Sequence, residues 1–506
     1  MVPPFVSSEL KTGSATVPPV CAGLTCGCPV FLNCFTSTER LGSDVAWMKP
    51  LHWAAAQAAS PLDRPINRRT LEPQPRQLKE ILMRLTLSCL ALTSLLLSGC
   101  GRLTTPANSA PVTILTVPVT AAQSDEDLTR LYGGRVELRT ETFAVIGDPT
   151  RAPLQAQGTG PAPQDNQDVV AVNPGQTEPG MWGNIVRDFW PNAPELWSSI
   201  VRDDWRFNSS DAWVSDTYSP LPANTAAWKK IGLKEAHQGT ALGAGKIIAV
   251  IDTGLDLTHP MFTNLLTPAN TWRDFVDDDA TPQDLGAVGK GSFGHGTVVA
   301  GIAAQLAPRA KIMPLRVLDS DGRGDTLNVA AAVVWATNHG AHVINLSLGT
   351  SRAQDALTQA IAYANSKRVL VVAAAGNFNK AAPDYPAAQM KGGRYSVAVG
   401  SVNQDDLKSD FSSYGEAIGL MAPGQEIAAP FPDRRMGQFS GTSMSAPVVA
   451  GALALGLGEG AGAEQTLKAL KDKARRIDRL DGNSAYQGLL GKGRLDLKDF
   501  IDELDD

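Results

Sequence analysis

Strand-length apolar runs that each end in a polar residue constrain the fold of this chain most. After Lys246 the chain is apolar through Ile251 and then reaches Asp252-Thr-Gly, and a second run beginning at Val371 leads to Asn377. Strands buried on both faces of a parallel sheet read as continuous apolar runs, and ligands gather at the carboxyl ends of such strands. The sequence therefore predicts an α/β domain with Asp252 and Asn377 at the edge where chemistry takes place.

Two predicted helices begin at residues that can catalyse acyl transfer. His295 precedes the apolar run 298–304, and Ser443 precedes the apolar run 448–457. The N-terminus of a helix surrounds Ser443 with N–H groups and positive potential. A serine hydroxyl attacks when an imidazole takes its proton, and a buried carboxylate orients that imidazole. Asp252, His295 and Ser443 are the candidate catalytic residues, with the Asn377 side chain and the Ser443 N–H as candidate oxyanion donors.

These motifs and their order along the chain resemble the subtilisin family of serine proteases over about residues 213–500. The resemblance implies an α/β fold, a three-layer α/β/α domain with a mainly parallel sheet over 213–502, preceded by a small α+β pro-region. It implies that Asp252 orients His295, that His295 acts as general base and then acid, that Ser443 attacks, and that Asn377 binds the oxyanion. The matching motifs are Asp252-Thr-Gly, His295-Gly-Thr, Asn345-Leu-Ser-Leu-Gly349, Ala374-Ala-Gly-Asn377, Tyr385-Pro-Ala387, Phe411-Ser-Ser-Tyr-Gly415, Met421-Ala-Pro-Gly424 and Gly441-Thr-Ser-Met-Ser-Ala-Pro447.

The resemblance also implies where a peptide substrate binds. An extended substrate pairs with two backbone stretches, which are Ser347-Leu348-Gly349 and Gly322-Arg323-Gly324 here, and Gly376 is a further candidate substrate-binding residue. Arg323 is either a solvated turn residue or a contact to substrate. Asp384 takes the place of the pocket floor, where a carboxylate favours Lys or Arg before the scissile bond. The short gap between Asn377 and Tyr385 leaves open that Asp384 faces solvent instead.

The first hundred residues contain a secretion signal in an unusual place. Residues 83–100 give one basic residue, an apolar run and small residues, the order of a signal peptide, and the run is too short to span a membrane comfortably. Leu97-Ser-Gly-Cys100 resembles a bacterial lipobox, which implies lipid on Cys100; the alternative is an ordinary signal peptide. Residues 1–82 show no sustained period, and we interpret them as a non-native upstream extension, with Met83 as the true start, or as a disordered segment.

All six cysteines lie in this first part of the chain. Those from Cys21 to Cys34 have no zinc-site spacing that we can justify. The catalytic segment has none, so it needs no disulfide in either redox compartment. We expect an extracellular or cell-envelope protein, anchored to the membrane through lipid.

Residues 101–180 read as a tether, a pro-region and a linker. The tether is 101–120, the pro-region has a helix followed by strands over 125–148, and the linker is 149–180. The resemblance implies that the pro-region inhibits the enzyme until it is removed, so we expect self-cleavage between residues 149 and 215.

A Trp-rich repeat follows at 181–212. Trp182–Trp190 recurs as Trp197–Trp205, and the apolar residues of each copy lie at helical spacing, which predicts two short helices. Their apolar face either covers a patch on the catalytic domain or contacts the membrane surface.

The sequence calls for no cofactor in the chemistry. An acidic loop with Asp277, Asp278 and Asp279 is either a structural Ca²⁺ site or a solvated loop. The net charge of −6 gives no reason to expect nucleic acid as a partner. The partners we expect are protein or peptide substrates, the chain's own pro-region, and the membrane. The rival function is a lipid-anchored binding protein that keeps the fold without turnover, which hydrolysis of casein would distinguish.

Overall fold

The structure is a computed structural model that describes residues 110–151, 161–171, 201–206 and 221–505. Several predictions fall outside these residues: the upstream extension 1–82, the signal peptide 83–100 with Cys100, and the first Trp copy, Trp182–Trp190.

A seven-stranded sheet forms the centre of the fold, in the order β15-β14-β13-β11-β7-β9-β8. Every neighbouring pair of strands in this sheet runs parallel. The strands are β7 (Ile247–Asp252), β8 (Arg273–Asp274), β9 (Lys311–Arg316), β11 (Val343–Leu346), β13 (Leu370–Ala374), β14 (Ser396–Val402) and β15 (Ile418–Pro423). Because the strands are parallel, their carboxyl ends meet along one edge of the sheet.

Alternate residues of these strands enter two separate hydrophobic cores. In β7, Ile248 and Val250 belong to one core, whereas Ala249 and Ile251 belong to the other. Successive side chains of a strand point to opposite faces, so both faces of the sheet are covered. This double burial explains why β7 reads as apolar without alternation.

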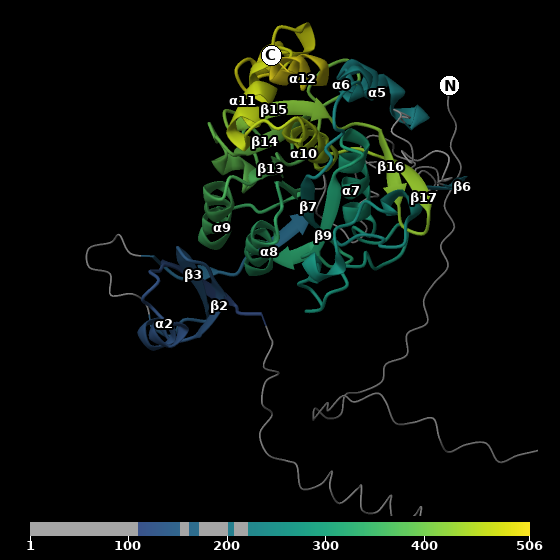
Figure 1. The fold of residues 1–506 in the computed structure, drawn as a ribbon. Coiled ribbons are helices and arrows are strands. Elements are labelled where there is room, and N and C mark those ends of the chain that lie inside the picture. Colours follow the sequence, from purple (N-terminus) through teal and green to yellow (C-terminus); the bar gives the residue numbers. More distant parts are fainter. Residues whose placement is uncertain (1–109, 152–160, 172–200, 207–220, 506) are drawn as a thin grey trace, which may run out of the picture. The chain divides into compact units, whose positions relative to one another are not determined.

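Helices supply the two covering layers, as Figure 1 shows. α7 packs against α10 on the side of the first core, and α8 packs against α9 on the side of the second. The predicted three-layer α/β/α fold is confirmed. The helices of this domain are α5 (Thr225–Lys230), α6 (Leu233–His237), α7 (His295–Leu306), α8 (Thr326–Asn338), α9 (Asp355–Ser366), α10 (Thr442–Gly458), α11 (Ala463–Asp472) and α12 (Leu497–Asp505).

Residues 110–151 and 161–165 form a small α+β unit, as predicted for the pro-region. Helix α2 (Asp125–Tyr132) begins with a capping box between Ser124 and Asp127, and its Leu128 is fully buried. A four-stranded sheet has the order β2-β3-β1-β4. Its strands are β1 (Thr113–Pro118), β2 (Arg135–Arg139), β3 (Phe143–Gly147) and β4 (Gln164–Asp165).

Two predictions about this region are wrong. The expected tether 101–120 contains β1, and the expected linker 149–180 contains β4 and β5 (Asp168–Ala171). Residues 113–118 (TILTVP) alternate only in part, but Ile114, Leu115 and Val117 are buried once β3 pairs with them. Pairing with distant strands therefore decides the structure of these segments more than their composition does.

The second Trp copy also departs from its prediction. Residues Val201–Arg206 form a strand, β6, and not the end of a helix. β6 pairs antiparallel with β17 (Arg435–Phe439), which itself pairs with β16 (Ile427–Phe431). The open edge of a hairpin offers unpaired N–H and C=O groups. Hydrogen bonding to these groups outweighs the helical spacing of apolar residues in the sequence.

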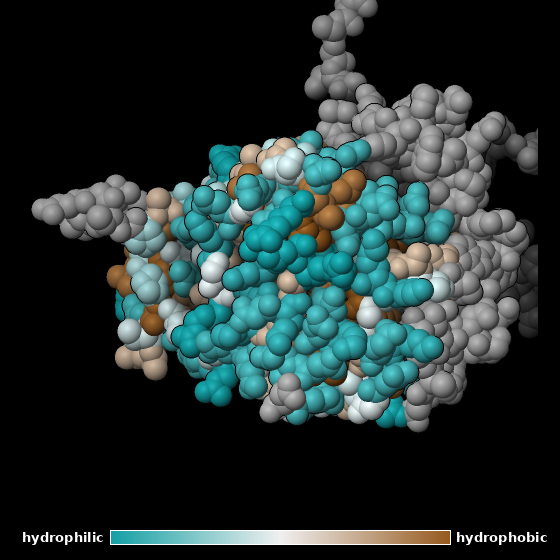
Figure 2. Space-filling model, turned by 90° about the horizontal axis from the view of Figure 1, so that it is seen from above, coloured by the Kyte–Doolittle hydropathy of each residue, from teal (hydrophilic) through white to brown (hydrophobic). Residues whose placement is uncertain are grey.

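The described surface is mainly hydrophilic on the face drawn in Figure 2, where hydrophobic residues form only small spots. Within the described part of the chain, every helix is too short or too polar to cross a membrane.

Candidate active site

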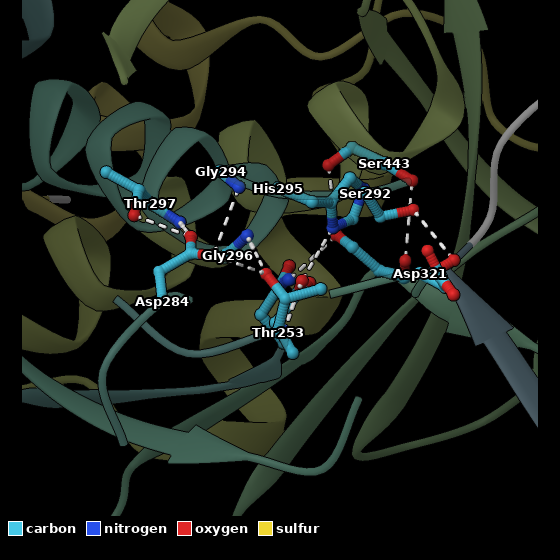
Figure 3. Close-up of polar contacts among 12 residues, drawn as sticks. Thr253, Asp284, Ser292, Gly294, His295, Gly296, Thr297, Asp321 and Ser443 are labelled. Carbon is cyan, nitrogen blue, oxygen red and sulfur yellow. Dashed lines mark hydrogen bonds and ion pairs between the residues drawn. The ribbon is translucent and has the colours of Figure 1, made fainter. Parts of the chain in front are cut away.

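Asp252 and His295 meet at the carboxyl edge of the sheet. Asp252 is the last residue of β7, and His295 is the first residue of α7. The distance from His295 Nδ1 to Asp252 Oδ1 is 2.6 Å, and both side chains are fully buried. The Thr253 N–H also donates to Asp252 Oδ1, at 2.8 Å. These contacts fix the orientation of both the carboxylate and the imidazole. His295 and Thr253 are labelled in Figure 3.

Ser443 is the second residue of α10 and is fully buried. Its Oγ lies 3.4 Å from the carbonyl oxygen of Ser347, the residue that follows β11. Pro447 has no N–H, so it cannot donate to the Ser443 carbonyl one turn earlier. The Ser347 hydroxyl donates to that carbonyl instead, at 2.9 Å. The end of β11, which is paired with β7, thus holds Ser443 at the edge that carries Asp252.

Asn377, which follows β13, is held by the residue beside Ser443. Its Oδ1 accepts hydrogen bonds from the Thr442 N–H at 2.8 Å and from the Thr442 hydroxyl at 2.9 Å. A Cβ placed on Gly441 would lie 3.3 Å from Asn377 Nδ2 and 3.7 Å from the Ser443 nitrogen. The two predicted oxyanion donors therefore border the same small space, which a side chain at residue 441 would fill.

The two backbone stretches predicted to bind substrate flank a strand of the chain itself. Ser347 precedes β12 (Leu348–Gly349), and Gly322 precedes β10 (Arg323–Asp325), which contains Gly324. β5 lies between them in a three-stranded sheet of order β10-β5-β12. Both pairings are antiparallel, with Ala171 opposite Leu348, and Val170 opposite both Gly349 and Arg323. Val169 is fully buried in this arrangement.

Asp384 lies against Gly376, another of the predicted substrate-binding residues. Its N–H donates to the Ala375 carbonyl at 2.9 Å, and a Cβ on Gly376 would come within 2.3 Å of its Oδ2. Burial raises the pKa of Asp384. Lys380, whose Nζ lies 3.8 Å from Asp384 Oδ1, lowers this pKa in turn because it stabilises the carboxylate. Asp384 therefore packs closely on Gly376, next to Asn377, with a cation near its carboxylate.

The acidic loop binds arginines and does not present a metal site. Arg316 Nη1 lies 2.7 Å from Asp274 and 2.5 Å from Asp277. Asp278 pairs with Arg273, and Asp279 Oδ1 accepts from the Thr281 N–H at 2.7 Å. In the described part of the chain, no three His, Cys, Asp or Glu side chains are grouped closely enough to hold a metal ion. Asp277, Asp278 and Asp279 thus do not fit the calcium site considered from the sequence.

Several residues around the site were not predicted from the sequence. Thr442 could have been found from the sequence, because it directly precedes Ser443. Thr253 and Asp284 were missed, and a single acidic residue in a loop carries no distinguishing pattern. Asp284 is 3% exposed, and its carboxylate accepts from the Gly294 N–H at 3.0 Å and from the Thr297 hydroxyl at 2.8 Å.

Comparison with known proteins identifies the family of this chain. The subtilase family model matches residues 243–485. Thermitase from Thermoactinomyces vulgaris is 39% identical over 265 residues, which cover 50% of this chain and 88% of thermitase. Subtilisin BL from Lederbergia lenta is 37% identical over 246 residues, 46% of this chain and 84% of that protein. A crystal structure of a cold adapted subtilisin-like serine proteinase is 34% identical with a TM-score of 0.42, covering 47% of this chain and 86% of that one. The chain belongs to the subtilase family and is a serine-type endopeptidase.

Proposed function

We propose that this endopeptidase cleaves peptide bonds with Ser443 as nucleophile, His295 as general base and then acid, and Asp252 as the group that orients His295. The buried 2.6 Å contact between His295 Nδ1 and Asp252 Oδ1 carries the proposal. This contact leaves Nε2 as the nitrogen that takes the Ser443 proton during attack and returns it to the leaving amine. The carboxylate also stabilises the imidazolium that forms in between.

The oxyanion of the tetrahedral intermediate is bound by Asn377 Nδ2 and the Ser443 N–H. The Thr442 contacts to Asn377 Oδ1 support this role, because they fix the amide so that its nitrogen borders the space beside Gly441. Donors fixed in advance stabilise developing charge without reorganising.

A serine-directed covalent inhibitor tests the nucleophile. It should abolish hydrolysis of a small peptide amide and add its mass to the peptide that contains Ser443. Ser443→Ala should be inactive. Ser445→Ala is the matched control, since Ser445 is a buried serine on the same helix that bonds to the Ala422 carbonyl at 3.0 Å, and it should remain active. Labelling of another residue, or an active Ser443→Ala enzyme, would remove Ser443 from this role.

The chain is made as an inhibited precursor that cleaves itself, and the place of β5 supports this step. β5 occupies the position expected for a substrate strand, and main-chain pairing of this kind is how extended peptides bind to open strand edges. The pro-region also reaches the helices of the catalytic domain. Asn166 Oδ1 accepts from the Leu327 N–H at 3.1 Å in the first turn of α8, and Gln164 Oε1 accepts from the Asp355 N–H at 2.9 Å at the start of α9.

The pairing register of β5 reduces the range in which we expect self-cleavage, which is 149–215 from the sequence, to a short stretch. β5 ends at Ala171, which lies opposite Leu348, the residue after Ser347. The Ser347 carbonyl is the group that Ser443 Oγ approaches at 3.4 Å. We therefore expect the cut within the few residues that directly follow Ala171.

N-terminal sequencing of the mature enzyme measures this position. Purified full-length Ser443→Ala should stay intact, whereas Ser445→Ala should be cut like the unchanged protein. Loss of the pro-region from isolated Ser443→Ala would refute self-cleavage. A mature N-terminus before Val172, or within or after the Trp-rich repeat 181–212, would refute the register.

The primary pocket prefers Lys or Arg before the scissile bond through Asp384. The contact of Asp384 with Gly376 supports this preference, and Lys380 weakens it by neutralising part of the charge. Competition between matched peptides with Lys, Phe or Ala at that position measures it. Asp384→Asn should reduce kcat/KM for the Lys peptide and leave the Phe peptide unchanged. A wild-type enzyme that cuts only after aromatic or aliphatic residues would exclude the role.

The precursor is tethered to a membrane by lipid on Cys100 and acts outside the cytoplasm. The lipobox-like Leu97-Ser-Gly-Cys100 supports this. Full-length Ser443→Ala expressed in a bacterial host should partition into detergent, and the additional change Cys100→Ser should move it to the aqueous phase. Equal partitioning of the two proteins would rule out the anchor.

A further inference from the structure

We propose that Asp284 is a positioning residue that fixes His295 against Asp252 by binding the start of α7 and the end of β7 together. The proposal rests on the catalytic roles assigned to Asp252 and His295 above. Asp284 itself does not touch the reacting atoms. It acts through Gly294, Thr297 and Thr253, which are labelled with it in Figure 3.

Asp284 replaces the missing N-cap of the helix that presents His295. The N-cap residue of α7 is Gly294, which has no side chain to bind the free N–H groups of the first turn. Asp284 Oδ1 accepts from the Gly294 N–H at 3.0 Å, and Oδ2 accepts from Thr297 through its hydroxyl at 2.8 Å and its N–H at 3.4 Å. A negative group is also favoured at the positive end of the helix dipole. The carboxylate thus fixes the residues on both sides of His295.

The same carboxylate reaches the strand that presents Asp252. The Thr253 hydroxyl lies 3.5 Å from Asp284 Oδ1 and accepts from the Gly296 N–H at 2.9 Å. The Asp284 N–H donates to the Leu255 carbonyl at 3.0 Å, so the Asp284 backbone is bound to the loop that leaves β7. Both neighbours of the catalytic pair, Thr253 and Gly294, are therefore held by one buried side chain.

Stabilisation of the start of α7 alone does not account for this arrangement. Asp284 is 3% exposed, and the described structure gives it four donors but no cation. Burial raises the pKa of Asp284 to about 7, and the charge of Asp252 adds to this, whereas the Gly294 and Thr297 donors oppose it. A carboxylate that is costly to bury and lies between the two catalytic residues is better explained by their alignment.

The test compares kcat and KM of Asp284→Asn with those of a matched control. Asn keeps the shape but turns one acceptor into a donor that faces the Gly294 or Thr297 donors. A displacement of about 1 Å at a catalytic group can cost about 10²-fold, so we expect kcat to fall by about 10–100-fold with KM within about threefold. Asp406→Asn removes another buried carboxylate, which pairs with Arg494 at 3.1 Å, and should leave kcat within about threefold.

The outcomes separate this inference from the assignment of the catalytic residues. If His295→Ala is inactive and Asp284→Asn keeps kcat within about twofold of the unchanged enzyme, positioning by Asp284 is refuted while the catalytic roles stand. If His295→Ala keeps its activity, the catalytic roles themselves fail. Equal losses of kcat in Asp284→Asn and Asp406→Asn would indicate general destabilisation and also refute the proposal. Should Asp284→Asn not fold, Thr253→Val removes the bridging hydroxyl, and a kcat within about twofold there is the refuting result.

Discussion

Two substitutions at Asn377 separate its contribution to folding from its contribution to catalysis. Asn377 Oδ1 accepts two hydrogen bonds from Thr442, at 2.8 and 2.9 Å, while Nδ2 is the proposed oxyanion donor. Asn377→Ala removes both functions. Asn377→Asp keeps an acceptor for Thr442 but replaces the donor with a negative oxygen beside the developing charge.

The expected magnitudes follow from this division. Each lost hydrogen bond contributes about 0.5–1.5 kcal/mol, so Asn377→Ala should lower the free energy of unfolding by about 1–3 kcal/mol, and Asn377→Asp by less. Removing one oxyanion donor lowers kcat by about 10²–10³-fold, a range established on a subtilisin. Asn377→Asp should lower kcat further, because its carboxylate repels the oxyanion in addition to lacking the donor. The less stable variant is therefore expected to be the more active one.

The assays must be protected from self-digestion. Unfolding in urea is measured on enzyme blocked by a serine-directed inhibitor or carrying Ser443→Ala, and kcat is measured with a small peptide amide on active enzyme counted by titration. If Asn377→Ala keeps kcat within about tenfold of the unchanged enzyme, Asn377 is not an oxyanion donor. If Asn377→Asp is as unstable as Asn377→Ala, the Thr442 contacts do not stabilise the fold as reasoned here.

Three further measurements test other parts of the structure. Lys380→Gln removes the cation 3.8 Å from Asp384 and should raise the preference for Lys over Phe before the scissile bond by about two- to tenfold in kcat/KM; an unchanged ratio would show that Asp384 does not meet the substrate. Because the pKa of Asp284 rises from 3.8 to about 7, the folded state holds a proton there that the unfolded chain has released, so the free energy of unfolding should fall as pH rises through that window, by on the order of 4 kcal/mol at most. Asp284→Asn, blocked in the same way and unfolded in urea at about pH 5 and about pH 8, should lack that slope, and equal slopes would contradict the raised pKa. Asn224→Ala removes three contacts of 2.7–2.8 Å to Gln305 and Ala428 and should cost about 2–4 kcal/mol of unfolding free energy, whereas a loss below about 1 kcal/mol would mean that these bonds are replaced by water.

The central sheet could be predicted because burial on both faces leaves a continuous apolar run. β7 and the start of α7 lie within a residue of where the sequence puts them, and the sheet is parallel as expected. The first residues of α7 and α10 could also be predicted from the sequence, because in each case a polar motif directly precedes an apolar helical run. Local pattern and final structure agree wherever the core decides both.

The remaining elements depend on partners far away in the sequence. β1 forms because it pairs with β3, and β6 because it pairs with β17. β5 forms between the edges of β10 and β12. No local sequence pattern indicates these pairings. The second Trp copy, Trp197–Trp205, is an example in its described part. The spacing of its apolar residues alone favours a helix, but the open edge of the hairpin favours a strand. Asp284 was missed for a similar reason, because its importance lies in donors that come from two other elements.

The placement of β5 has a consequence for where the active enzyme is found. The bond expected to break lies after Ala171, whereas the proposed lipid is on Cys100, so a single cut leaves the anchor and the catalytic domain on different polypeptides. The pairing of β5 and the contacts between the pro-region and the catalytic domain, among them those of Asn166, Gln164 and Glu141, would then keep the enzyme at the surface. Departure of the pro-region would both open the cleft and set the protease free to diffuse, so the onset of activity and release from the cell would share one rate.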